Sequence, residues 1–143
     1  MRHFRWITVA LLALGFAAGC GGDGSGGGDA PFTAEERAAV GQLRYCFEGA
    51  GALTARPGER IAELDRTPTG PETGDAKRVL VAYWADTGNA AHLYYADDAD
   101  AAERAADDLS SDGVESRGNL IVVPDEDSPP SSDEALLASD CLY

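Results

Sequence analysis

Histidine, the commonest general base and a frequent zinc ligand, is scarce in this 143-residue chain. Its two histidines are His3 and His92, and His3 lies within the first twenty residues, which have the pattern of an export signal. A Ser-His-Asp or Cys-His site would need His92, yet the sequence contains no G-x-S-x-G nucleophile elbow. One histidine also provides too few ligands for a zinc site. We therefore expect His92 to be a partnered strand residue, and we predict no catalytic residue, no metal ligand and no cofactor.

Carboxylates are abundant, with 25 Asp and Glu residues. Seven of them lie between Asp97 and Asp112, and three more are consecutive at 125–127. Because hard cations take several oxygen ligands, a calcium-binding surface module is one alternative function. The 97–112 run lacks the glycine and terminal glutamate of an EF-hand loop, so we expect a solvated helix surface there. A carboxylate-dependent hydrolase of the cell envelope is a second alternative, although spacing alone singles out no pair of acids.

Aromatic side chains crowd two neighbouring segments, at Tyr83-Trp84 and at Tyr94-Tyr95. Side chains alternate between the two faces of a strand, so Trp84, His92 and Tyr94 share one face in some registers of a hairpin. If helices cover only the opposite face, these three residues form an exposed aromatic and polar platform for a ligand or partner. The alternative is ordinary core and edge packing.

The first twenty residues predict export from the cytoplasm. A short basic region with Arg2 and Arg5 precedes a run of apolar and small residues from Trp6 to Ala18, which is too short for a comfortable membrane span. Ala17-Ala18-Gly19-Cys20 resembles the lipobox of bacterial lipoproteins, although leucine is usual at the position of Ala17. The resemblance implies a signal peptide over 1–19, cleavage before Cys20 and lipid on its thiol. An ordinary cleaved signal and an uncleaved anchor are alternatives.

The resemblance to a lipoprotein signal implies how the remainder of the chain is divided. We expect residues 20–30 to be the lipidated cysteine and a flexible glycine-rich tether, and residues 31–143 to be a single domain. An odd number of cysteines in an exported protein requires an explanation. If Cys20 carries lipid, Cys46 and Cys141 remain as a disulfide pair. We thus expect a protein anchored by lipid to the outer face of the bacterial cytoplasmic membrane or to the cell envelope.

The negative net charge of the chain disfavours two classes of binding partner. The whole chain carries −14, and without residues 1–19 nine basic residues face 25 acidic ones, a net charge of −16. Nucleic-acid binding is disfavoured because phosphate recognition needs a basic surface. Adhesion of the domain to anionic lipid is disfavoured for the same reason. Possible partners are therefore an envelope protein or a small ligand, besides the membrane that holds Cys20.

The hydrophobic pattern predicts an α+β domain. Thr33 and Glu36 have the spacing of a capping box, and a helix is expected over 34–48. The segment 52–64 is ambiguous between strand and helix, and 67–74 is predicted to be an exposed loop. The remaining expectations are a hairpin of 79–85 and 91–95, a helix begun by Asp97 or Asp98, a strand at 119–123 or 114–116, and a final helix capped by Ser132 or Asp133.

These elements favour a two-layer sandwich with a mixed three- to four-stranded sheet, helices mainly on one face, and one disulfide. The element order, the cysteine near the end of the first helix, and Arg117-Gly118-Asn119 before a valine-rich strand are similar to small secreted domains of actinobacteria. That resemblance implies a fold type and no activity. The leading functional expectation is a non-enzymatic module that binds a protein, peptide or small ligand.

Overall fold

The computed structural model describes residues 32–109 and 112–143. Predictions for the signal peptide, Cys20 and the tether lie outside these residues. No helix within the described ranges is long and apolar enough to cross a bilayer. The elements are α1 (Ala34–Gly49), β1 (Leu53–Ala55), a 3₁₀ turn η1 (Ala62–Leu64), β2 (Ala76–Trp84), β3 (Asn89–Ala96), α2 (Ala99–Leu109), β4 (Glu115–Arg117), β5 (Leu120–Pro124) and α3 (Ser132–Leu142).

The predicted α+β class is confirmed, but the sheet differs from the expected one. It has five strands in the order β1-β2-β3-β5-β4, and every neighbouring pair is antiparallel. The prediction of a mixed sheet with three or four strands is wrong, because the sheet has a fifth strand and no two neighbouring strands run parallel. The long hairpin of β2 and β3 forms the centre, and the two edge strands have three residues each.

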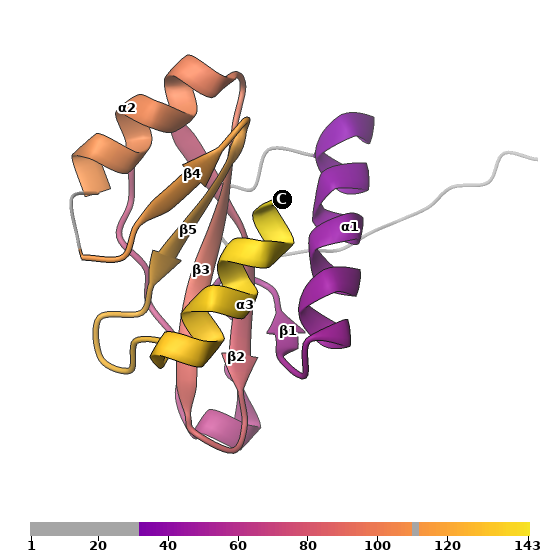
Figure 1. The fold of residues 1–143 in the computed structure, drawn as a ribbon, viewed down its shortest axis with the longest axis vertical. Helices are drawn as coiled ribbons and strands as arrows, with labels where there is room; N and C mark the ends of the chain where they lie inside the picture. Colours follow the sequence, from indigo (N-terminus) through magenta and orange to yellow (C-terminus); the bar gives the residue numbers. More distant parts are fainter. Residues whose placement is uncertain (1–31, 110–111) are drawn as a thin grey trace, which may run out of the picture. The chain divides into compact units, whose positions relative to one another are not determined.

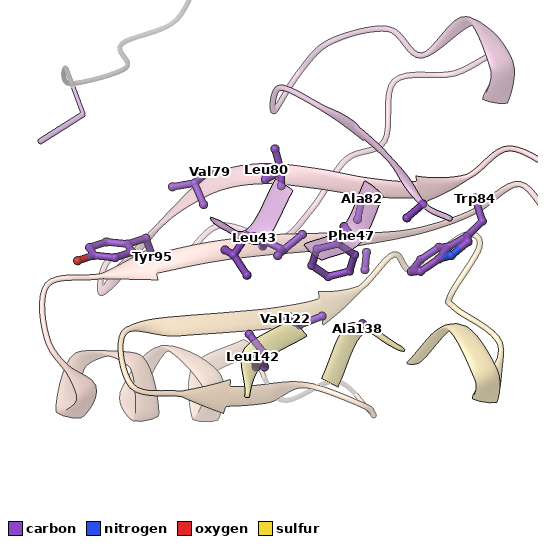
Figure 2. Close-up of a cluster of buried hydrophobic side chains, with 13 residues drawn as sticks. Leu43, Phe47, Val79, Leu80, Ala82, Trp84, Tyr95, Val122, Ala138 and Leu142 are labelled. Carbon is purple, nitrogen blue, oxygen red and sulfur yellow. The ribbon is translucent and has the colours of Figure 1, made fainter. Parts of the chain in front are cut away.

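Helices cover both faces of the sheet, so the prediction of a two-layer sandwich is also wrong, although α1 and α3 share one face and α2 alone covers the other (Figure 1). On one face, α1 and α3 pack over alternate residues of β2, β3 and β5, and Figure 2 shows Phe47, Leu80 and Trp84 in this cluster. On the other face, the alanines Ala101, Ala102 and Ala105 of α2 pack over β3 and β5. An alanine stripe permits this close approach because it leaves little side chain between the helix and the sheet.

The segment between β1 and β2 covers the rest of the α2 side of the sheet. Ile61 packs with Val81 and Tyr83, and Pro68 is fully buried. Gly70 lies so close to the sheet that a Cβ atom there would be 2.8 Å from the ring of His92. The expectation of an exposed loop at 67–74 is therefore only partly right, because the loop buries Pro68 and lies against β3.

The starts of α1 and α2 and the disulfide agree with the predictions, whereas the cap of α3 differs by one residue. Thr33 and Glu36 form the predicted capping box at the start of α1. Asp98 accepts a hydrogen bond from the backbone of Ala101 at the start of α2, whereas Ser131, one residue before the expected cap, begins α3. Cys46 in the last turn of α1 is bonded to Cys141 of α3, with 5.7 Å between their Cα atoms. This bridge joins the first helix to the last.

Candidate functional site

An open groove lies where the end of α1, the start of β1, the end of β2 and the start of α3 meet. We call it the α1–α3 groove. Its volume is about 510 Å³, within the range of ligand-binding pockets. Apolar and small side chains alternate with three carboxylates along its walls. The groove is lined by Ala50, Gly51, Leu53, Trp84, Ala85, Asp86, Asp133, Glu134 and Leu137.

Local backbone geometry brings these elements together. Gly51 has a φ of +86°, which glycine adopts without a side-chain clash, and the chain leaves α1 here to enter β1. Leu53 then pairs with Tyr83, which sets β1 against the last residues of β2. Trp84 follows on β2 and meets Phe47 of α1 edge to face, with 6.5 Å between ring centres (Figure 2). The floor of the groove is therefore part of the main core.

Glu134 fixes the position of α3 against the β2–β3 turn. Its two carboxylate oxygens accept hydrogen bonds from Thr87 Oγ1 and Asn89 Nδ2, each at 2.7 Å, and from the backbone amide of Ser131. Burial raises the pKa of this carboxyl, but these hydrogen bonds lower it by more, so its net pKa lies below the ordinary value. Glu134 is consequently an ionised structural group in the wall of the groove.

The open part of the groove combines exposed leucines with negative charge. Leu53 is 43% exposed and Leu137 is 37% exposed. Asp86 and Asp133 are exposed at its rim, and neither forms an ion pair with another residue in the described ranges. The indole nitrogen of Trp84 is buried and has no hydrogen-bond acceptor among those residues. This arrangement suits an apolar group with positive charge next to it.

A second polar cluster lies inside the protein, on the α2 side of the sheet. Asp125 is buried, and its Oδ2 lies 3.0 Å from His92 Nε2. Its Oδ1 lies 2.9 Å from Arg66 Nη2 and accepts a hydrogen bond from the Ser128 amide at 3.0 Å. Burial raises the pKa of Asp125, but the hydrogen bonds from Arg66, His92 and Ser128 lower it by more. The cluster therefore joins two segments to His92 of β3. One is the segment between β1 and β2, which contains Arg66, and the other is the segment at and after the end of β5, which contains Asp125 and Ser128.

His92 is neutral in this setting. Burial lowers the pKa of the imidazole, and the nearby Arg66 and Arg78 charges lower it further. The hydrogen bond to Asp125 and the charge of Asp125 raise the pKa, but by less than burial lowers it, so the net shift is downward. Because an ionised carboxylate only accepts, His92 Nε2 donates and Nδ1 is left as a buried acceptor with no partner in the described part of the chain. The ring is fully buried, so no substrate reaches it in this conformation.

The structure separates the three residues proposed as a binding face. Trp84 lies on the α1 and α3 side of the sheet and is 5% exposed, whereas His92 and Tyr94 lie on the opposite side under the 67–74 loop. The hydroxyl of Tyr94 donates to the carbonyl of Pro71, and burial raises its pKa to about 12. The expected exposed platform is therefore absent, and of the three residues only Trp84 lines the α1–α3 groove.

Sequence reasoning missed the groove and Glu134. A signal for Glu134 was present, because Ser131-Ser132-Asp133-Glu134 has the S-x-x-E spacing of a capping box. The leucines Leu53 and Leu137 gave no such signal, since their exposure depends on where β1 and α3 meet. No group of three or more His, Cys, Asp or Glu residues within 32–109 and 112–143 is arranged to hold a metal ion.

The fold and the groove define a small disulfide-bonded α+β domain with an antiparallel sheet covered on both faces and an acidic, partly apolar groove at one end of α1. Comparison of the chain with protein-family models, with curated proteins and with solved structures gave no match.

Proposed function

We propose that the chain is an exported lipoprotein whose folded domain is a non-enzymatic binding module. In this proposal Cys20 carries the lipid at the outer face of the bacterial cytoplasmic membrane or the cell envelope. The α1–α3 groove binds a peptide segment of an envelope protein. The segment inserts an apolar side chain between Leu53 and Leu137 and carries lysine or arginine beside it.

The disulfide supports the lipid anchor. Cys46 and Cys141 are bonded to each other, which leaves Cys20 as the third cysteine. Disulfides persist in oxidising compartments outside the cytoplasm, so the bridge agrees with export. Lipid on Cys20 explains why an exported chain contains an odd thiol. Two acyl chains on that thiol are sufficient for stable membrane attachment.

The composition of the α1–α3 groove carries the proposal of binding. Leu53 and Leu137 present apolar surface to solvent, and the charged residues around them, Asp86, Asp133 and Glu134, are all acidic. An apolar anchor supplies most of the affinity at such a site, while complementary charge steers the partner and selects it. A partner segment that has an apolar side chain beside a lysine or arginine therefore matches both features.

The alternative of a carboxylate-dependent hydrolase gains no comparable support. A general acid for glycoside cleavage needs a carboxyl group whose pKa is raised. Glu134 is the buried carboxylate of the groove, and its pKa is lowered by three hydrogen bonds. Asp125 also has a lowered pKa and lies away from the groove. The geometry thus favours binding over acid catalysis.

The anchor is tested by Cys20→Ser in a bacterial host. The wild-type chain should be labelled by radioactive palmitate and should sediment with membranes. The variant should lose the label and appear in the soluble extracytoplasmic fraction. Labelling that persists in Cys20→Ser would refute the anchor.

The groove is tested with a random-peptide display library selected on the intact protein. We expect enriched peptides to contain an apolar residue beside lysine or arginine, and Leu137→Glu to abolish their binding. Leu136→Glu is the matched control, because Leu136 is on the same helix, is 63% exposed and does not line the groove. Equal loss of binding in both variants, or enrichment without basic residues, would overturn the assignment of the groove.

A further inference from the structure

A second hollow lies near the start of α1 and has the opposite charge to the rest of the protein. We call it the Arg37–Arg44 hollow. It is lined by Phe32, Arg37, Val40, Gly41 and Arg44 and has a volume of about 290 Å³. Its charged residues are both arginines, in a chain whose net charge is −14.

Helix geometry places the two arginines on one stripe of α1. Arg37 and Arg44 are seven residues apart, which is about two turns, so their side chains project from the same flank. Gly41 lies between them, and a Cβ atom there would meet nothing within 4 Å. The absence of a side chain at Gly41 leaves the space between the two guanidinium groups open.

The arginines are available for an external anion. Both are exposed, and neither forms an ion pair with another residue of 32–109 or 112–143. The two acids of the first turn form no ion pair with these arginines: Glu36 accepts a hydrogen bond from the Thr33 amide, and Glu35 lies about 200° around the helix from Arg37. Glu48, one turn beyond Arg44, accepts a hydrogen bond from Thr54.

Phe32 adds an apolar wall to the hollow, and the positive charge of Lys77 lies beside its ring. The ammonium group of Lys77 lies 4.1 Å from the centre of the Phe32 ring, on the neighbouring strand β2. Three of the nine basic residues that follow Cys20 are therefore gathered on or beside this hollow. Guanidinium pairs beside an aromatic ring suit a phosphate attached to an apolar body.

We propose that the Arg37–Arg44 hollow binds the phosphate of an anionic phospholipid headgroup in the membrane to which Cys20 is attached. This inference rests on the proposed lipid anchor. Eleven residues separate Cys20 from Phe32, so the hollow lies no more than about 40 Å along the chain from the lipid surface. Attachment therefore holds the hollow at high effective concentration relative to headgroups.

The charge distribution gives this contact an orienting role. The acidic remainder of the domain is repelled by anionic lipid, so the basic flank of α1 selects one orientation. The α1–α3 groove begins at Ala50, about 20 Å along the axis of α1 from Arg37. This separation leaves the groove free to bind a partner while the hollow contacts a headgroup.

The test uses the full lipidated chain reconstituted in vesicles of phosphatidylcholine with a photoactivatable phosphatidylglycerol. Cross-links mapped by mass spectrometry should fall within residues 32–44. Each arginine at an anionic surface favours the bound orientation roughly fivefold, so Arg37→Glu with Arg44→Glu should lower the cross-link yield by about 25-fold or more. Arg60→Glu with Arg104→Glu makes the same change in net charge on other exposed surfaces and should leave the yield near wild type.

Two readouts separate failure of this inference from failure of the anchor. Vesicle sedimentation reports the anchor alone, and a wild-type chain that does not sediment refutes the lipoprotein proposal and with it this inference. A chain that sediments but cross-links at scattered positions, or equally in both double variants, overturns the headgroup site and leaves the anchor standing. Binding of soluble glycerol phosphate at Arg37 and Arg44 without any cross-link to the bilayer would also overturn it.

Discussion

Acid should destabilise this domain through His92 well before its carboxylates titrate. The imidazole is fully buried, and its pKa is lowered from the ordinary value of 6.5. The unfolded chain therefore binds a proton at a pH where the folded protein does not. Stability from the neutral ring is fully present above pH 6.5 and is lost as the pH falls from 6.5 toward the folded pKa.

The size of the effect follows from proton linkage. One proton taken up on unfolding changes the free energy of unfolding by at most about 1.4 kcal/mol per pH unit. Between about pH 7.5 and pH 5.5 we therefore expect a loss of up to about 1.4 kcal/mol. Asp125 and Glu134 also have lowered pKa values, but their stability is lost only below their ordinary values of 3.8 and 4.5. The window above pH 5 thus isolates His92.

Urea denaturation of the intact protein at several pH values measures this dependence. The wild type should lose stability below pH 6.5, and His92→Gln should show a much shallower slope even though it is less stable overall. NMR titration of the His92 ring in the wild type provides a check that needs no variant. A flat wild-type profile, an unchanged slope in His92→Gln, or a ring pKa above 6.5 would refute the reasoning.

Three further predictions concern stability and are measured by thermal or urea unfolding. Cys46→Ser should lower the free energy of unfolding by up to about 4–5 kcal/mol, because the disulfide closes a loop with a sequence separation of 95. Reduction of the disulfide in the wild type should lower it by no less. Gly70→Ala should cost about 1–3 kcal/mol by forcing its loop off the imidazole ring, while Gly74→Ala, whose Cβ meets nothing, should be near neutral. Glu134→Ala should cost about 2–3 kcal/mol through lost hydrogen bonds, against little change for the exposed Glu126→Ala.

Local signals predicted the elements, because they depend on residues close in sequence. The capping box of Thr33 and Glu36, the hairpin around Asp86–Asn89 and the helix begun by Asp98 needed only short-range rules. The pairing of Cys46 with Cys141 followed from the number of cysteines once Cys20 was set aside. These predictions required no knowledge of how the strands align.

The faces of the sheet could not be predicted, because they depend on register. Trp84 pairs with Asn89 and Val81 pairs with His92, which puts Trp84 and His92 on opposite sides. A shift of one residue would have placed them together. The register also slips between Arg78 and Leu80, so alternation along β2 fails there. The loop that buries Pro68 and places Gly70 against His92 has little hydrophobic pattern, so its packing on the sheet could not be predicted. The α1–α3 groove could not be predicted either, because it forms where elements far apart in the sequence meet.

The bridge between α1 and α3 has a mechanical consequence. Cys46 lies near the end of α1 and Cys141 near the end of α3, so the sheet and α2 lie inside the covalent loop. Force applied between Phe32 and Tyr143 extends only the residues outside that loop, about 60 Å of chain, instead of about 380 Å for the reduced protein. A load on the protein therefore peels α1 as far as Cys46 and then passes through the sulfur–sulfur bond, and the sheet carries little of the tension.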